Sequence, residues 1–354
     1  MTREKRDITA LREWFLRARR SLPWRENHTP YRVWVSEVML QQTQVSVVIP
    51  YFERWMELFP TIEALAAADI DQVIKAWEGL GYYSRARNLH AGAKEIVCKY
   101  GGAFPSTKED LLKIKGLGSY TAGAILAFAF QKRAAAVDGN VRRVLARYDA
   151  IQLSIDLPSV QKEMEERTLA LLPTTDPHQV MEGLIELGAL ICQKNPQCFK
   201  CPLSNGCRAY INGLEKELPI RRKRPKILAL HRLVWIAIQG NHVLVSKGKK
   251  GKVMADLWHF PFFELDTMID IEVVEKELES FLGQVTYAKE LDTIKHGFTR
   301  YQATLYPHVW VSATQVELLN HTWVHIDQLT SLPFCSGHRE LARELKSVVL
   351  SLGV

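Results

Sequence analysis

The segment LLKIKGLGSYTAGAILAFAF, residues 111–130, predicts two apolar helices joined by a tight turn. Gly116 and Gly118 permit positive φ and close approach, so that backbone N–H groups can point outward at an anion. A helix beginning near Ser119 adds its dipole at the same place. A Gly-x-Gly between helices is often only a helix corner, but Lys113 and Lys115 favour a helix-hairpin-helix that grips the DNA backbone without reading its sequence.

The regions around this hairpin divide the chain. Apolar residues recur three and four positions apart from about Thr9 to Glu217, which predicts helices. Residues 218–227, LPIRRKRPKI, carry five basic residues and two prolines, as is typical of an extended linker. Strands are expected over 231–238, 242–245, 257–263 and 301–311, and a helix over 271–282. We therefore expect a multi-domain fold, with an all-α domain over 1–218, a basic linker over 219–230 and an α+β domain over 231–354.

The formal net charge of +7 is unevenly distributed. Residues 1–231 hold 34 Lys and Arg against 25 Asp and Glu, whereas residues 232–354 hold 12 against 14. A basic N-terminal part beside a nearly neutral C-terminal part indicates a polyanionic partner for the first. Ordinary solubility charge explains the same numbers equally well, so charge alone does not decide.

The N-terminal segment MTREKRDITALREW has no apolar stretch of signal-peptide length. The most apolar segment, residues 121–130, is too short to span a bilayer. We therefore expect a soluble, cytoplasmic protein with no membrane association.

Four of the six cysteines, Cys192, Cys198, Cys201 and Cys207, fall within sixteen residues. Such a cluster in a long chain without a signal peptide indicates a metal site rather than disulfides. Four thiolates suit zinc or an iron–sulfur cluster, and ligand number does not separate the two. Cys98 and Cys335 stand alone and are expected to be buried small hydrophobic residues.

Two carboxylates are candidates for catalysis. Glu37 lies in the apolar helical segment WVSEVMLQQTQV, where a buried carboxyl would hold a proton at neutral pH. Asp138 lies in AAAVDGNVRRVL, where the chain starts a helix. The simpler interpretations are a solvated helix face for Glu37 and an N-cap for Asp138.

The order of the segments SEVMLQQTQV, WEGLGYYSRARNL, IKGLGSYTAGAI, VDGNVRRVL, ELGALIC and the cysteine loop resembles the endonuclease III superfamily, and within it the MutY-type adenine DNA glycosylases. The resemblance is close over about residues 8–215 and looser beyond. It implies a base-excision-repair enzyme that flips adenine out of duplex DNA and hydrolyses its N-glycosidic bond opposite 8-oxoguanine or guanine. It also implies a [4Fe–4S] cluster on the four cysteines and a monomer on DNA.

The resemblance implies roles for individual residues. Glu37 resembles the general acid that protonates adenine at N7, and Asp138 the carboxylate that stabilises the oxocarbenium ion, as in retaining glycosidases. Asn140 and Tyr120 resemble residues that support the sugar and the attacking water. The remaining expected contacts are Trp24, Arg25, Leu40 and Val45 in the adenine pocket, Glu182 at the adenine edge, and Gln42 and Tyr82 beside the orphaned base.

The chain departs from the family pattern at three places. Lyase relatives carry a lysine in the hairpin as a Schiff-base nucleophile, whereas Ser119 and Tyr120 stand there in this chain, which predicts a monofunctional enzyme. Five residues rather than six separate Cys192 from Cys198, which predicts a tightened loop.

The third departure lies in the C-terminal domain, which resembles the Nudix-like module that recognises 8-oxoguanine. Its helix over 271–282 lacks the paired acidic residues of a hydrolytic Nudix box, so we expect no pyrophosphohydrolase activity. The recognition loop appears as Phe298-Thr299-Arg300, in which arginine replaces a histidine. Arginine favours non-specific phosphate contact, which leaves open how strongly 8-oxoguanine is preferred over guanine.

Two other functions are consistent with parts of the sequence. A glycosylase for another lesion, such as an oxidised pyrimidine, would share the hairpin and the cysteine loop, but the missing lysine and the C-terminal module argue against it. A non-catalytic DNA-binding or iron–sulfur redox module would not need both Glu37 and Asp138.

Overall fold

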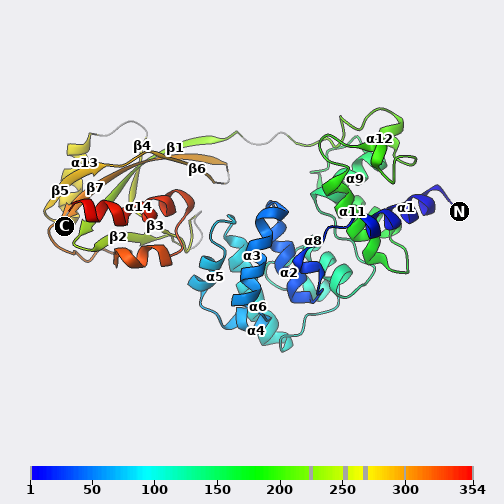
Figure 1. Ribbon diagram of the computed structural model, residues 1–354, viewed down its shortest axis with the longest axis horizontal. Coiled ribbons are helices and arrows are strands. Elements are labelled where there is room, and N and C mark those ends of the chain that lie inside the picture. Colours follow the sequence, from blue (N-terminus) through cyan, green and yellow to red (C-terminus); the bar gives the residue numbers. More distant parts are fainter. Residues whose placement is uncertain (1, 223–225, 250–253, 266–269, 299, 353–354) are drawn as a thin grey trace. The chain divides into compact units, whose positions relative to one another are not determined.

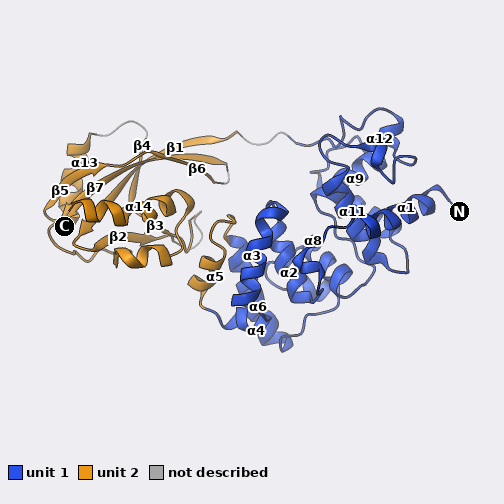
Figure 2. Ribbon diagram, viewed as in Figure 1, with its two compact units in different colours: residues 1–68, 84–223 blue, residues 69–83, 224–354 orange. Residues whose placement is uncertain are grey.

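The computed structural model describes residues 2–222, 226–249, 254–265, 270–298 and 300–352. The chain forms two compact units (Figure 2): residues 1–68 with 84–223, here called the helical unit, and residues 69–83 with 224–354, here called the sheet unit. Residues 69–83, which belong to the helical stretch by sequence, thus group with the sheet unit by contact.

The helical unit consists of short helices (Figure 1). They are α1 (Arg3–Ala18), α2 (Pro30–Leu40), α3 (Val45–Leu58), α4 (Ile62–Ala67), α6 (Ser84–Tyr100), α7 (Lys108–Leu111), α8 (Ser119–Ala124), α9 (Gly139–Tyr148), α10 (Pro158–Leu171), α11 (Pro177–Leu190) and α12 (Arg208–Ile211). A π-helical turn, Ile125–Ala129, continues α8.

Helix α2 is the buried helix of this unit. Pro30 at its first turn and the Thr29 side chain, which accepts a hydrogen bond from the Arg32 N–H, set its start. Its residues from Val33 to Met39 are all buried. A helix that is apolar on every side must lie inside the domain, and this position removes Glu37 from water.

The hairpin predicted over residues 111–130 is present, with α7 before the turn and α8 after it. Gly116 has φ +86°, and a Cβ there would meet Asn88 Cβ at 2.7 Å, so glycine is required on both grounds. The expectation of a similar need at Gly118 is wrong, because Gly118 has φ −90° and open space around its missing side chain. Gly118 is the N-cap of α8, and its missing side chain leaves the helix start uncovered.

The sheet unit contains one mixed eight-stranded sheet and its helices. They are α5 (Ile70–Ala76), β1 (Leu228–Gln239), β2 (His242–Lys247), β3 (Trp258–His259), β4 (Phe262–Leu265), α13 (Ile271–Leu282), β5 (Val285–Glu290), β6 (Ile294–Phe298), β7 (Tyr301–Ser312), β8 (His321–His325) and α14 (Ser336–Leu352). The strand order is β3-β2-β1-β7-β5, with β4 on β1, β6 on β7 and β8 on β2.

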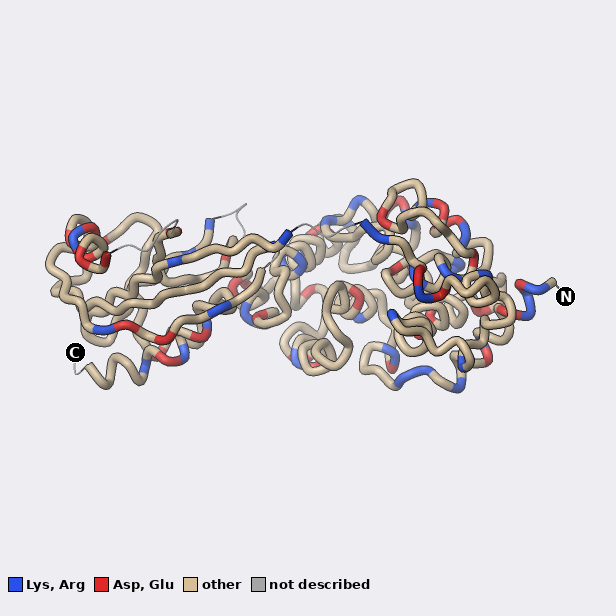
Figure 3. The backbone as a smooth tube through the Cα atoms, turned by 90° about the horizontal axis from the view of Figure 1, so that it is seen from above, with Lys and Arg blue, Asp and Glu red and all other residues tan. Residues whose placement is uncertain are grey.

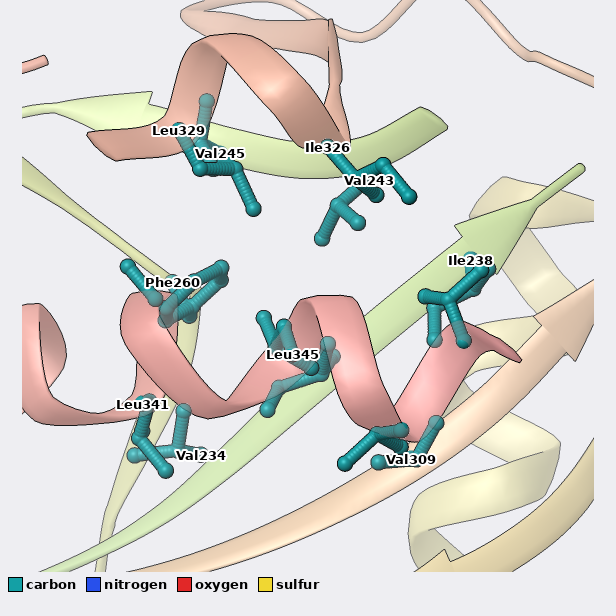
Figure 4. Close-up of a cluster of buried hydrophobic side chains, with 14 of the residues drawn as sticks. Val234, Ile238, Val243, Val245, Phe260, Val309, Ile326, Leu329, Leu341 and Leu345 are labelled. Carbon is teal, nitrogen blue, oxygen red and sulfur yellow. The ribbon is translucent and has the colours of Figure 1, made fainter. Parts of the chain in front are cut away.

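The two faces of the sheet are set by alternation along β1. Val234, Ile236 and Ile238 pack in one core, to which α14 contributes. The alternate residues Leu233 and Trp235 point to the other face of the sheet and pack in a second core, to which α13 contributes. Figure 4 shows the first core, where Leu341 and Leu345 of α14 lie against the sheet. A period of two with both faces covered explains why residues 233–238 of β1 are all apolar.

The predicted α+β composition is confirmed, and α13 has the bounds expected from the sequence. The strand expected over 257–263 is broken at Phe260-Pro261 into β3 and β4, since Phe260 turns into the core. Lys and Arg are interspersed with Asp and Glu in both units, and basic residues flank the grey trace at the linker (Figure 3). Among the described residues, no helix combines the length and apolarity that crossing a membrane requires.

Candidate active site and cysteine loop

A cavity of about 470 Å³ lies within the helical unit. It is formed by α2 with the segments before and after it, the hairpin, the start of α9, and α11. Ten of the residues expected at the active site line it: Trp24, Arg25, Glu37, Leu40, Gln42, Val45, Tyr120, Asp138, Asn140 and Glu182. Residues as distant as 24 and 182 in the sequence thus share one site.

Glu37 is a buried acid at this cavity. Its side chain is placed by α2, and Tyr120 from α8 donates a hydrogen bond to Glu37 Oε2. Burial raises the pKa of Glu37 to about 7, with the carboxylates of Asp138 and Glu182 adding to the rise and the Tyr120 hydroxyl opposing it. Half of the molecules therefore hold a proton on Glu37 near neutral pH, which suits a general acid.

Asp138 is the N-cap of α9 and also a wall of the cavity. Its Oδ1 accepts from the N–H groups of Asn140 and Val141 at 2.9 and 2.7 Å, and its Oδ2 accepts from Asn140 Nδ2 at 2.8 Å. Burial raises the pKa of Asp138, while these hydrogen bonds oppose the rise. The N-cap position of Asp138 is therefore compatible with a catalytic role, because capping fixes the carboxylate at the wall of the cavity that also contains Glu37.

Several polar residues of the cavity were not anticipated from the sequence. Among them, Arg20, His28 and Glu186 line it beside Arg25 and Glu182. Glu186 follows Glu182 by four residues on the apolar helix α11, and its side chain is fully buried. The sequence contained a signal for Glu186, because two carboxylates four residues apart in an apolar helix lie on the same helix face. That spacing indicates that Glu186 shares its surroundings with Glu182.

Two other expected contacts, Tyr82 and Phe298, do not line this cavity. Tyr82 is in the sheet unit by contact, half exposed, with φ +48°. Gln42, the second expected wedge residue, also has positive φ, +60°. Such conformations cost a non-glycine residue of order 1 kcal/mol and concentrate at functional sites. Phe298 ends β6 and stacks near Tyr301 at 5.5 Å, while Thr299 lies outside the described residues.

Ser119 starts α8 but its hydroxyl is engaged within the protein. It donates to the Glu165 carboxylate at 2.9 and 3.0 Å, and Lys108 Nζ pairs with the same carboxylate at 3.1 Å. The anion-binding capacity of the hairpin therefore lies in its backbone and in the start of α8 rather than in the Ser119 side chain.

The four clustered cysteines surround one small cavity together with Arg147 and Glu215. Burial raises the pKa of Cys201 to about 12 in the absence of metal, with the neighbouring thiols adding to it. Within the described residues, no three or more His, Cys, Asp or Glu side chains are placed closely enough to hold a single metal ion. Among the isolated cysteines, Cys335 is buried as expected, whereas the expectation is wrong for Cys98, which is exposed.

Arg143 connects the cysteine loop to the cavity. Its Nε donates to the Cys192 carbonyl at 2.6 Å, and its Nη2 donates to Asn140 Oδ1 at 2.8 Å and to the Gly188 carbonyl at 2.7 Å. Asn140 in turn donates to Asp138. Three consecutive hydrogen bonds therefore join the backbone of the first cysteine to the candidate catalytic carboxylate.

The chain is similar to known DNA repair proteins. The chain matches the HhH-GPD superfamily base excision DNA repair protein model over residues 35–170 and the NUDIX domain model over residues 233–344. It is 36% identical over 247 residues to the adenine DNA glycosylase of Buchnera aphidicola subsp. Baizongia pistaciae, covering 69% of this chain and 70% of that one. It is 41% identical over 221 residues to the human adenine DNA glycosylase, covering 58% of this chain and 40% of that one.

Solved structures agree on the fold of the helical part. A thermostable thymine-DNA glycosylase is similar with a TM-score of 0.55 and 27% identity, over 59% of this chain and 97% of that one. A trapped endonuclease III–DNA covalent intermediate is similar with a TM-score of 0.52 and 24% identity, over 60% of this chain and 99% of that one.

Proposed function

The chain belongs to the adenine DNA glycosylases, and from this membership we propose that it excises adenine mispaired with 8-oxoguanine or guanine, with Glu37 and Asp138 as its two catalytic carboxylates. The observation that carries the proposal is a buried carboxyl with a pKa of about 7 in the same cavity as a second, N-capping carboxylate. One acid protonated near neutrality beside one carboxylate held by N–H donors is what glycosidic cleavage requires.

The reaction divides between these groups. DNA presents a flipped adenine to the cavity, with unstacking offset by backbone contacts at the hairpin. Glu37 donates its proton to adenine N7, which turns the base into a neutral leaving group. Asp138 stabilises the oxocarbenium ion left on the sugar, and Asn140 and Tyr120 hold the two carboxylates in place. Water then completes hydrolysis, since neither Ser119 nor Tyr120 supplies the amine of a Schiff base.

A single experiment tests the enzyme assignment. Duplexes with A opposite 8-oxoguanine, A opposite guanine, and C opposite guanine are incubated with the protein and then cleaved with alkali at abasic sites. We expect cleavage at A in the first two duplexes only, and loss of product in the Glu37→Gln variant. Product from the third duplex, or an unchanged rate in Glu37→Gln, would refute the proposal. Trapping with borohydride should give no robust covalent adduct.

We propose that the Phe298-Thr299-Arg300 segment of the sheet unit determines the preference for 8-oxoguanine over guanine. Arg300 lies with its guanidinium 5.3 Å from the Tyr301 ring centre and donates to the Tyr301 hydroxyl at 3.2 Å. An arginine placed in this way offers charge to phosphate rather than a base-specific contact, so we expect only a modest preference. Comparing adenine release from the first two duplexes measures it, and a preference above about 200-fold would contradict this reasoning, because it exceeds the upper limit of about 3 kcal/mol for one good base contact.

We propose that the cysteine loop holds a [4Fe–4S] cluster through Cys192, Cys198, Cys201 and Cys207. The four thiols share one cavity, and Arg147 Nη1 lies 3.3 Å from Cys192 Sγ, where it would stabilise a thiolate. Such a cluster ties the loop into the fold and holds its basic residues against DNA. Iron and sulfide analysis with a visible absorption spectrum tests this, and zinc alone in the purified protein would refute it. We further propose that the protein acts as a cytoplasmic monomer on DNA.

A further inference from the structure

Four charged residues form a closed ionic cluster at one wall of the adenine cavity. Arg20 and Arg25 come from the segment between α1 and α2, and Glu182 and Glu186 from α11. The cluster holds two positive and two negative charges, so it is neutral as a whole. Within it, Glu186 is the member without solvent contact, because its side chain is 0% exposed.

Glu186 has both oxygens fully used. Arg20 donates to it with Nε at 2.7 Å and Nη2 at 2.9 Å, and the Arg20 N–H adds a third bond at 3.1 Å. Arg25 Nη2 donates to Glu186 Oε2 at 3.0 Å. These bonds lower the pKa of Glu186 against the effect of its burial. Glu186 therefore stays ionised and cannot itself serve as a proton donor to a ligand.

Arg25 is held on three sides as a result. Besides the Glu186 bond, its Nη1 donates to the Arg20 carbonyl at 3.0 Å and its Nε pairs with Glu182 Oε2 at 3.0 Å. Each edge of the planar guanidinium thus has one partner, which removes its freedom to turn. In the described part of the chain nothing hydrogen-bonds Glu182 Oε1, which leaves that oxygen for a ligand in the cavity.

We propose that Glu186 is a positioning residue for base recognition, which fixes Arg25 so that Arg25 in turn holds the Glu182 carboxyl in place, with one oxygen directed at the exocyclic amine of adenine. Burial raises the pKa of Glu182, and Arg25 opposes that rise. The inference rests on the proposed function, in which Glu182 reads the adenine edge. An ionised carboxylate accepts from an amine, whereas a protonated one competes as a donor, so the ion pair with Arg25 decides what Glu182 recognises.

The test compares two bases that differ only in that amine. Single-turnover rates and half-saturating enzyme concentrations are measured for adenine and for unsubstituted purine, each opposite 8-oxoguanine. We expect Glu186→Gln to lower the preference for adenine over purine about tenfold, the effect of losing one charge-assisted hydrogen bond. The alkaline limb of the pH profile, which belongs to Glu37, should stay in place. Glu166→Gln on α10, whose side chain is 68% exposed, is the matched control and should change neither quantity.

Two further variants keep the outcomes distinct. Glu182→Gln should abolish the preference; if it does not, the proposed role of Glu182 fails. If Glu182→Gln abolishes the preference but Glu186→Gln keeps it within twofold, only the inference about Glu186 fails. Should Glu186→Gln not fold, Arg20→Gln serves instead, since the Arg20 side chain is 32% exposed and its removal leaves Arg25 as the charged partner of Glu186 beside the residue 20 N–H. Arg20→Gln should lower the preference for adenine over purine, and Arg20→Lys should retain part of it. If both variants show the same preference as the parent protein, the inference is overturned.

Discussion

The hydrogen bond from Tyr120 to Glu37 makes a prediction about pH dependence. The Tyr120 hydroxyl stabilises the ionised form of Glu37 and so opposes the rise of its pKa, which burial nonetheless brings to about 7. Tyr120→Phe removes the hydroxyl and keeps the ring that packs in the cavity wall. The pKa of Glu37 should therefore rise further, and the acid should remain protonated to higher pH.

The magnitude follows from the strength of such a bond. A hydrogen bond to a charged group contributes about 1.5–3 kcal/mol, and 1.36 kcal/mol corresponds to one pH unit. Solvent screening reduces this contribution only in part, because Glu37 is buried and Tyr120 is partly buried. Allowing for relaxation around the missing oxygen, we expect the alkaline limb of the activity profile to move up by about one pH unit.

The assay is single-turnover adenine release from an A opposite 8-oxoguanine duplex between pH 5 and pH 9.5, with Tyr120→Phe beside the parent protein. The position of the limb is the readout rather than the plateau rate, since Tyr120 also supports the sugar side. Tyr83→Phe, outside the cavity, is the control. A limb that stays in place or moves to lower pH would show that Tyr120 does not stabilise the Glu37 carboxylate, and the assignment of the acid would have to be revised.

Three further outcomes are expected. The folded-state pKa of Glu37 is about 7 against 4.5 for an ordinary glutamate, so the parent protein should lose stability as the pH rises from 5 to 8. Glu37→Gln lacks this titration and should therefore gain about 2.5 kcal/mol of unfolding free energy relative to the parent over that window, as measured by denaturant titration. An equal pH response of the two proteins would contradict this prediction. Arg143→Lys should slow adenine release about tenfold with iron content unchanged, because lysine keeps the charge but lacks the planar guanidinium that donates to Asn140 and to two backbone carbonyls at once; loss of iron would instead assign Arg143 to the loop alone. Cys198→Ser should lose the visible absorption of the cluster while Cys98→Ser, at an exposed position, keeps it; retention in both would remove Cys198 from the ligand set.

The sequence allowed the architecture to be predicted because the governing signals are local. Apolar spacing gave the helices and the change to strands near the linker, and the covered sheet faces explain the long apolar run of β1. Gly118 shows a limit of prediction from sequence. A glycine can serve by leaving a helix start uncovered rather than by adopting positive φ, and only the three-dimensional structure distinguishes the two. Cys98 shows another limit, since its exposure depends on which face of α6 the fold covers.

The candidate site was predictable as far as its motifs extend. Glu37 and Asp138 were found from a carboxylate in an apolar segment and from a helix start, and both lie at one cavity. Arg20 and Glu186 were missed, because their meaning depends on a pairing over 166 residues of sequence. No local pattern shows whether a carboxylate on a helix is a ligand-facing group or the anchor of an arginine.

The distribution of carboxylates around the cavity suggests why so many acids are placed in one buried site. Burial raises the pKa of Glu37, and every further negative charge adds to that rise. Burial likewise raises the pKa of Glu182, and Glu186 adds to that rise while Arg25 opposes it. Glu186 is buried as well, but its hydrogen bonds with Arg20 and Arg25 lower its pKa. Asp138 is instead compensated by N–H donors that carry no net charge. The acids thus have different hydrogen-bond or ionic partners: a hydroxyl for Glu37, N–H groups for Asp138, and guanidinium groups for Glu182 and Glu186. The kind of partner decides which acid holds a proton at neutral pH.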